Sequence, residues 1–136
     1  MTIRSVCLAV CRVLTVPILI ACGIASADDP PQSYKDAEQV WQKSRAKPEY
    51  QAYATDFAAL SNAFHIDERG GCYSLGAGPV NLMLLVSQAD AKGVSTIERV
   101  FYDTNNAKAR CFSNSYLGLP AKQPPFLPFV LQLRME

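Results

Sequence analysis

The stretch Val80–Gln88 (VNLMLLVSQ) constrains the fold more than any other part of this chain. Its middle is apolar at consecutive positions, so an extended segment would bury side chains on both faces, as a central strand does. The next run, Val94–Tyr102, is rich in β-branched and aromatic residues. The segment between them, Ala89–Gly93, ends in glycine and predicts the turn of a β-hairpin. The chain is therefore expected to contain a small antiparallel sheet.

The residues before this hairpin predict two helices. Ser33 can cap the first helix, because Asp36 completes an S-x-x-D capping pattern, and Pro48 suits the first turn of the second. Apolar and aromatic residues then recur at three- and four-residue intervals, which predicts an amphipathic helix packed on the sheet. This stripe consists of Tyr50, Tyr53, Ala54, Phe57, Leu60, Ser61 and Phe64. We expect a helical region over residues 33–64, ended by a solvated turn at His65–Gly71 that Gly70 and Gly71 make possible.

The residues after the hairpin predict a helix, a proline-rich turn and a last strand. Asp103 or Thr104 can cap a helix over Asn105–Tyr116, which Leu117–Pro120 ends. The prolines of Ala121–Phe129 enforce extended backbone. Apolar and polar residues alternate in Val130–Met135, as in a strand with one buried face. The predicted fold class is α+β, with two N-terminal helices packed on a small antiparallel sheet.

The N-terminus is typical of an exported protein. Residues 1–27 combine a basic start, a short apolar middle and the small residues Ala25-Ser26-Ala27, the pattern of a cleavable signal peptide. An uncleaved membrane anchor is the less favoured alternative. The residues Leu19–Cys22 also resemble a lipobox, which predicts a lipoprotein signal at 1–21 and an acylated Cys22. Residues 28–32 then form a short linker, and 33–136 a single globular domain.

Charge and cysteine content narrow the function classes. The chain has 13 Lys and Arg against 12 Asp and Glu, without the basic excess of a nucleic-acid-binding protein. Three of its cysteines lie in or beside the leader, and Cys72 and Cys111 remain. An even pair in an exported protein predicts one disulfide. A redox-active pair is the alternative, which no C-x-x-C spacing supports.

The order of strands and helix from Val80 to Met135, followed through the Pro-Pro-Phe turn, resembles the C-terminal domain of TonB-type energy transducers. A cysteine ahead of the hairpin and another in the helix make it more similar to the cysteine-bearing, AgmX-like variant. The resemblance covers residues 72–135 and implies β-β-α-β order and protein binding in the periplasm. It does not extend to energy transduction, because the apolar leader is predicted to be cleaved and residues 28–32 are far shorter than the family's proline-rich spacer.

No catalytic, cofactor-binding or metal-binding motif is recognisable. His65 is the only histidine, so any Ser-His or Cys-His mechanism would have to use it. We therefore expect a non-enzymatic protein with no cofactor and no metal, whose only membrane contact is a lipid on Cys22. A hydrolase that uses His65, Asp67 and Glu68 is the alternative, although neighbours in one turn seldom converge on a substrate.

The remaining candidate is a surface that binds a protein partner in the cell envelope of a Gram-negative bacterium, in the periplasm. The candidate residues are Pro124, Pro125, Phe126 and Phe129, a stiff backbone with two aromatic anchors. Core packing beneath the last strand is the competing interpretation of these residues, and an exposed strand edge is the other candidate surface. An inhibitor or immunity-type partner of an antibacterial effector or envelope enzyme suits such a domain. A TonB-like envelope adaptor that binds a membrane-protein segment is the alternative.

Overall fold

The computed structural model describes residues 29–136, and the side chains of all of these except residues 62–70. The predicted signal peptide, its two predicted cleavage sites and Cys22 lie outside the described residues. The elements follow in the order α1 (Tyr34–Ser44), α2 (Pro48–Tyr73), β1 (Val80–Val86), β2 (Ser95–Tyr102), α3 (Ala107–Tyr116), β3 (Pro120–Ala121) and β4 (Phe129–Met135). The strands form one antiparallel sheet in the order β3-β2-β1-β4, so the α+β class and the antiparallel sheet are confirmed.

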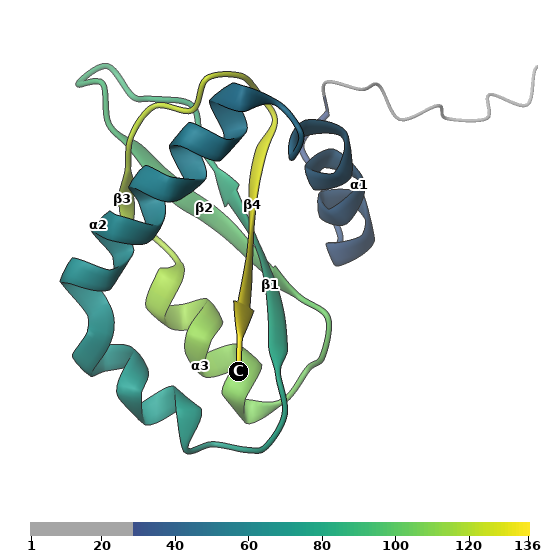
Figure 1. The fold of residues 1–136 in the computed structure, drawn as a ribbon, viewed down its shortest axis with the longest axis vertical. Coiled ribbons are helices and arrows are strands. Elements are labelled where there is room, and N and C mark those ends of the chain that lie inside the picture. Colours follow the sequence, from purple (N-terminus) through teal and green to yellow (C-terminus); the bar gives the residue numbers. More distant parts are fainter. Residues whose placement is uncertain (1–28) are drawn as a thin grey trace, which may run out of the picture.

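Strand β1 lies between β2 and β4 and is buried on both faces, as its apolar run predicts. Val80, Leu82 and Leu84 belong to the core shared with α2 and α3, whereas Met83 and Leu85 pack with Ala37 of α1. The sheet is therefore covered by α2 and α3 on one face and by α1 on the other (Figure 1). None of the helices in the described part of the chain has the length and hydropathy of a membrane span.

Helix α1 begins as its capping pattern predicts. The Ser33 side chain accepts a hydrogen bond of 3.2 Å from the backbone N–H of Asp36, which satisfies one of the free donors of the first turn. The helix ends at Ser44, before Lys47 and Pro48. Pro48 then starts α2 in the position where its missing N–H costs nothing.

The predicted helix break at His65–Gly71 is wrong, because α2 continues as a helix to Tyr73. Each glycine in a helix costs about 1 kcal/mol relative to alanine. Here that cost is outweighed by a contact distant in sequence, since Cys72, in the last turn of α2, is completely buried and bonded to Cys111 of α3. The chain turns only after Ser74, where Gly76 and Gly78 adopt positive φ angles of 156° and 86°.

The disulfide between Cys72 and Cys111 confirms the pairing that the sequence predicts. Its Cα atoms are 5.5 Å apart and its residues are 39 positions apart in sequence. The bond ties the end of α2 to the middle of α3. Close by, the Tyr73 ring meets the edge of Phe112 at 4.9 Å between centroids, so the two helices are joined covalently and by packing.

The hairpin turn between β1 and β2 is organised by one carboxylate. Asp90 Oδ1 accepts the backbone N–H groups of Lys92 at 2.8 Å and Val94 at 3.0 Å, and Gly93 has a φ of 77°. After β2, the predicted cap at Asp103 or Thr104 is wrong. Asn106 caps α3 through a 2.8 Å bond from the Ala109 N–H, because Asp103 is engaged by Asn81 across the hairpin.

The segment after α3 contains a strand that the sequence did not predict. β3 consists of Pro120 and Ala121 and pairs with Thr96 and Ser95 at the start of β2. Proline is tolerated here because β3 is at the edge of the sheet, where one side of the strand needs no donor. The chain then passes Pro124–Pro128 and enters β4 at Phe129, one residue before the predicted start.

Candidate functional site

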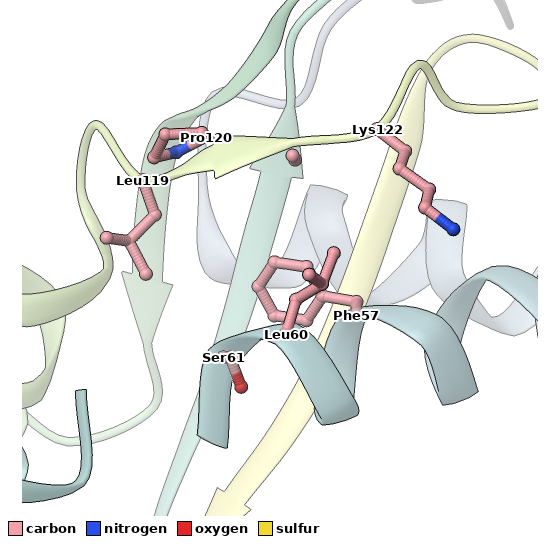
Figure 2. A pocket seen from close by; sticks show the side chains of 7 residues that line it. Phe57, Leu60, Ser61, Leu119, Pro120 and Lys122 are labelled. Carbon is pink, nitrogen blue, oxygen red and sulfur yellow. The ribbon is translucent and has the colours of Figure 1, made fainter. Parts of the chain in front are cut away.

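A pocket of about 370 Å³ lies between α2 and the segment that contains β3. We call it the α2–β3 pocket (Figure 2). Its described lining is almost entirely apolar and comes from two parts of the chain about sixty residues apart. The lining residues are Phe57, Leu60, Ser61, Leu119, Pro120, Ala121 and Lys122.

The helical wall follows from the amphipathic stripe of α2. Phe57 points from the helix into the interior and is 4% exposed, whereas Leu60, three positions on, is at the rim and 37% exposed. Leu60 is thus a partly exposed position in the stripe, since its neighbour Ser61 is buried again. Leu60 was predicted to be a core residue, but it lines the α2–β3 pocket and is partly exposed.

The opposite wall is fixed to the sheet by backbone hydrogen bonds. The Ile97 N–H donates to the Leu119 carbonyl at 2.9 Å, and the Gly118 N–H donates to the Ile97 carbonyl at 2.8 Å. Gly118 has a φ of 80°, which allows the chain to leave α3 and run directly into β3. This wall is thus held by β2, independently of α2.

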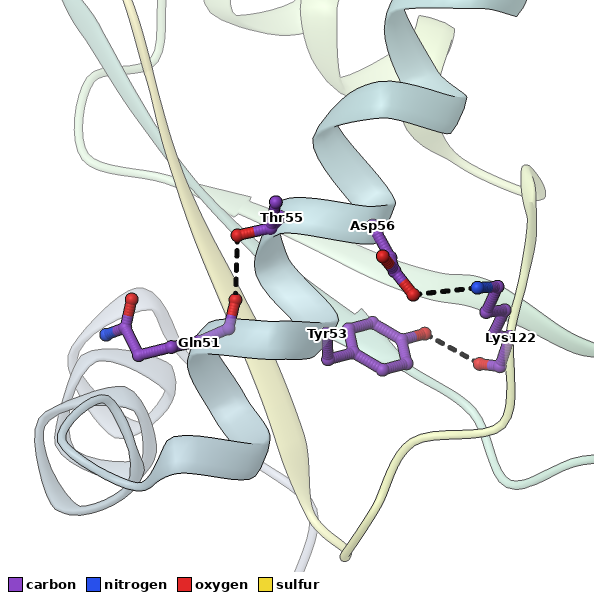
Figure 3. Close-up of polar contacts among 5 residues, drawn as sticks. All are labelled: Gln51, Tyr53, Thr55, Asp56 and Lys122. Carbon is purple, nitrogen blue, oxygen red and sulfur yellow. Dashed lines mark hydrogen bonds and ion pairs between the residues drawn. The ribbon is translucent and has the colours of Figure 1, made fainter.

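Two polar contacts of Lys122 join the walls at one end of the pocket (Figure 3). The Tyr53 hydroxyl donates to the Lys122 carbonyl at 2.6 Å, and the Lys122 ammonium donates to Asp56 Oδ2 at 2.7 Å. The ion pair is solvent-exposed, with 62% of the lysine and 57% of the aspartate side chain accessible. The backbone of Lys122 is therefore fixed by a buried tyrosine, while its charge stays at the surface.

Burial changes the acid–base behaviour of the tyrosines under this site. It raises the pKa of Tyr53 from 10.0 to about 12, so the hydroxyl keeps the proton that it donates to Lys122. Burial also raises the pKa of Tyr50, against smaller opposing effects of hydrogen bonds from the Gln132 backbone and the Trp41 side chain. Tyr50 thereby links α1, α2 and β4.

The predicted partner-binding segment is largely part of the core. Phe129 is completely buried, with its ring centroid 4.5 Å from Tyr53 and 5.4 Å from Tyr50. Phe126 is half-buried against Phe129, and the Lys47 ammonium lies 4.3 Å from the centroid of its ring. Of the two prolines, Pro124 is buried and Pro125 is exposed. Phe129 therefore packs in the core, and its ring is inaccessible to a partner.

The structure does not test the alternative hydrolase residues. His65, Asp67 and Glu68 belong to α2, and their side chains lie outside the described residues. Among the side chains of residues 29–61 and 71–136, no three His, Cys, Asp or Glu residues are grouped as a metal site would require.

Sequence reasoning missed the residues that form the α2–β3 pocket. Leu60 was part of a helical stripe, and Leu119 and Pro120 were read as the end of a helix. The pocket has no local signature, because it exists only where α2 passes the β3 segment. Comparison of the chain with protein-family models, curated proteins and solved structures finds no match. What the site can do must therefore be inferred from its geometry.

Proposed function

We propose that this chain is a non-enzymatic, exported protein-binding domain, which acts as an inhibitor or immunity-type partner of an antibacterial effector or envelope enzyme. The observation that carries the proposal is the α2–β3 pocket, an apolar hollow with exposed Leu60 at its rim. Protein partners gain most of their binding energy from a few large side chains inserted into such hollows. A partner side chain placed between Phe57 and Leu119 would lose its contact with water on both sides.

We place this function in the periplasm of a Gram-negative bacterium. The Cys72–Cys111 disulfide is typical of proteins that mature in an oxidising compartment. The signal-peptide pattern of residues 1–27 supports the same compartment, with Cys22 as a site for a lipid if the lipobox is used.

An envelope adaptor of TonB-like type is the second candidate. The chain order β1, β2, α3, β3 and β4, with β4 antiparallel beside β1, supports the TonB C-terminal-like relationship that residues 72–135 suggest, although the two-residue β3 is an addition to its β-β-α-β order. The packing of α1 and α2 on opposite faces of the sheet is an addition that this relationship does not require. In this case the partner would be a segment of a membrane protein.

Affinity capture from a native envelope extract, followed by mass spectrometry, tests the proposal. Leu60→Arg places a charge at the rim of the α2–β3 pocket. Leu75→Arg is the matched control, because Leu75 is also an exposed leucine, at 48%, but lies beyond the end of α2 and outside the pocket lining. Both changes are at exposed positions and are expected to leave folding within about 0.5 kcal/mol of the wild type.

The inhibitor proposal expects one stoichiometric enzyme or toxin that the wild type and Leu75→Arg retain and Leu60→Arg loses. The captured protein should also lose activity when bound. Capture of an outer-membrane protein or an envelope motor subunit instead would support the adaptor. Equal capture by both arginine variants would refute the α2–β3 pocket as the binding surface.

A further inference from the structure

The α2–β3 pocket also has the size of a small-molecule site. Its volume of about 370 Å³ is within the range of roughly 300–1,000 Å³ that ligand pockets occupy. A dry apolar cavity of about 150 Å³ already holds benzene. The pocket therefore has room for a ligand about twice that size, such as a single unbranched hydrocarbon chain.

The α2–β3 pocket has an apolar interior and one positively charged residue, Lys122, at its rim. Phe57, Leu60 and Leu119 line the pocket with apolar side chains, and Pro120 adds a ring rather than a polar side chain (Figure 2). Lys122 is the only charged residue among the described lining residues. A ligand that fills the interior would thus reach a single positive charge as it leaves the pocket.

The ion pair at this rim is exchangeable. Lys122 and Asp56 are both more than half exposed, and such pairs contribute only about 0–1 kcal/mol. A ligand carboxylate can therefore take the place of Asp56 beside the ammonium at little cost. The Lys122 backbone stays in place during this exchange, because it is held by the Tyr53 hydroxyl and not by Asp56.

We propose that the α2–β3 pocket binds an amphiphile with one hydrocarbon chain and a terminal carboxylate, the chemistry of a medium-chain fatty acid. The chain lies between α2 and β3, and the carboxylate pairs with Lys122. The ligand would occupy the same hollow as the partner side chain proposed above. Its binding is tested separately from that function, because the purified protein can be titrated with no partner present.

Calorimetric titration with sodium octanoate and with 1-octanol tests the inference. The two probes share a chain and differ in charge. Lys122→Met keeps an aliphatic side chain and should weaken octanoate binding about two- to fivefold, the range of an exposed ion pair, without changing 1-octanol binding. Asp56→Asn removes the competing carboxylate and should tighten octanoate binding by a similar factor, again without changing 1-octanol binding.

Leu60→Gln and Leu75→Gln separate the pocket from other apolar surface. We expect Leu60→Gln to weaken both probes and Leu75→Gln to weaken neither, with far-UV circular dichroism confirming that each variant is folded. Loss of both probes to the same extent in Lys122→Met would overturn the carboxylate assignment. Absence of binding to the wild type at millimolar probe, or equal binding by the two glutamine variants, would overturn the pocket as the ligand site.

Discussion

Removing the disulfide should cost this domain a large part of its stability. The perturbation is the double substitution of Cys72 and Cys111 by alanine. The bond closes a loop of about 40 residues, from a sequence separation of 39. For a loop of that length the chain-entropy relation gives a loss of roughly 13 cal/mol/K in the unfolded chain, or about 4 kcal/mol at 25 °C. Domains of this size have a net stability of only about 5–15 kcal/mol.

Urea denaturation followed by far-UV circular dichroism measures this loss directly. We expect the free energy of unfolding to fall by about 4 kcal/mol, and the melting temperature by about 15 °C. The wild type treated with a reducing agent should unfold at nearly the same urea concentration as the double variant. The double variant is its own control, because reductant should leave its stability unchanged.

Two results would refute this reasoning. A loss below about 1 kcal/mol would mean that packing alone, including the Tyr73–Phe112 contact, holds α2 against α3. A double variant that remains as sensitive to reductant as the wild type would mean that the measured effect does not come from this bond.

Three further predictions test the rest of the fold. Asn106→Ala removes the cap of α3 and should lower the free energy of unfolding by about 1 kcal/mol in urea, whereas Asn105→Ala, at an exposed neighbour that does not cap the helix, should cost much less. Phe129→Ala should cost about 3–5 kcal/mol in the same assay, because its ring is completely buried, and Pro125→Ala should stay within about 0.5 kcal/mol; a small loss for Phe129→Ala would contradict its place in the core. The pKa of Tyr53 is about 12 in the folded chain and 10.0 in the unfolded chain. The protonated hydroxyl therefore contributes fully to the free energy of unfolding below pH 10, and this contribution is lost as the pH rises to 12. Stability measured across that range should fall by up to about 3 kcal/mol more in the wild type than in Tyr53→Phe, and parallel curves would disprove this role.

The sheet was the part of the fold that the sequence predicted best, because its signal is local. Val80–Gln88 is apolar enough to be a central strand in any context, and Asp90 and Gly93 favour the turn that follows. The prediction extended the strand to Gln88, while β1 ends at Val86. Strand ends depend on where the partner strand stops pairing, which composition does not encode.

The end of α2 was mispredicted because the deciding contact is not local. Gly70 and Gly71 lower helix propensity, and a turn is the reasonable expectation from the residues around them. The bond from Cys72 to Cys111 and the packing of Tyr73 on Phe112 favour a helix that reaches α3. The sequence predicted the disulfide correctly but did not reveal that it requires a longer helix.

The proline-rich segment was predicted to bind a partner, and the structure buries part of it, Pro124 and Phe129. Prolines and phenylalanines are as suitable for a docking surface as for a chain reversal, and sequence alone does not distinguish them. In the fold, this reversal carries Phe129 under α2 and presents Lys122 to Asp56. The segment therefore supplies Lys122 to the lining of the α2–β3 pocket and buries Phe129, whereas Phe126 is half-buried and Pro125 is exposed.

The two contacts of Lys122 would allow the proposed ligand to bind this pocket without disturbing the fold. The buried Tyr53 hydroxyl fixes the Lys122 carbonyl, so the wall of the pocket does not depend on the exposed ion pair. The ion pair can exchange with a ligand, because both of its partners are already in contact with water. The Lys122 carbonyl therefore supports the fold, while the Lys122 ammonium is left to pair with the proposed ligand. Substitution of the Lys122 side chain should for this reason change ligand affinity much more than stability, whereas Tyr53→Phe should change stability first.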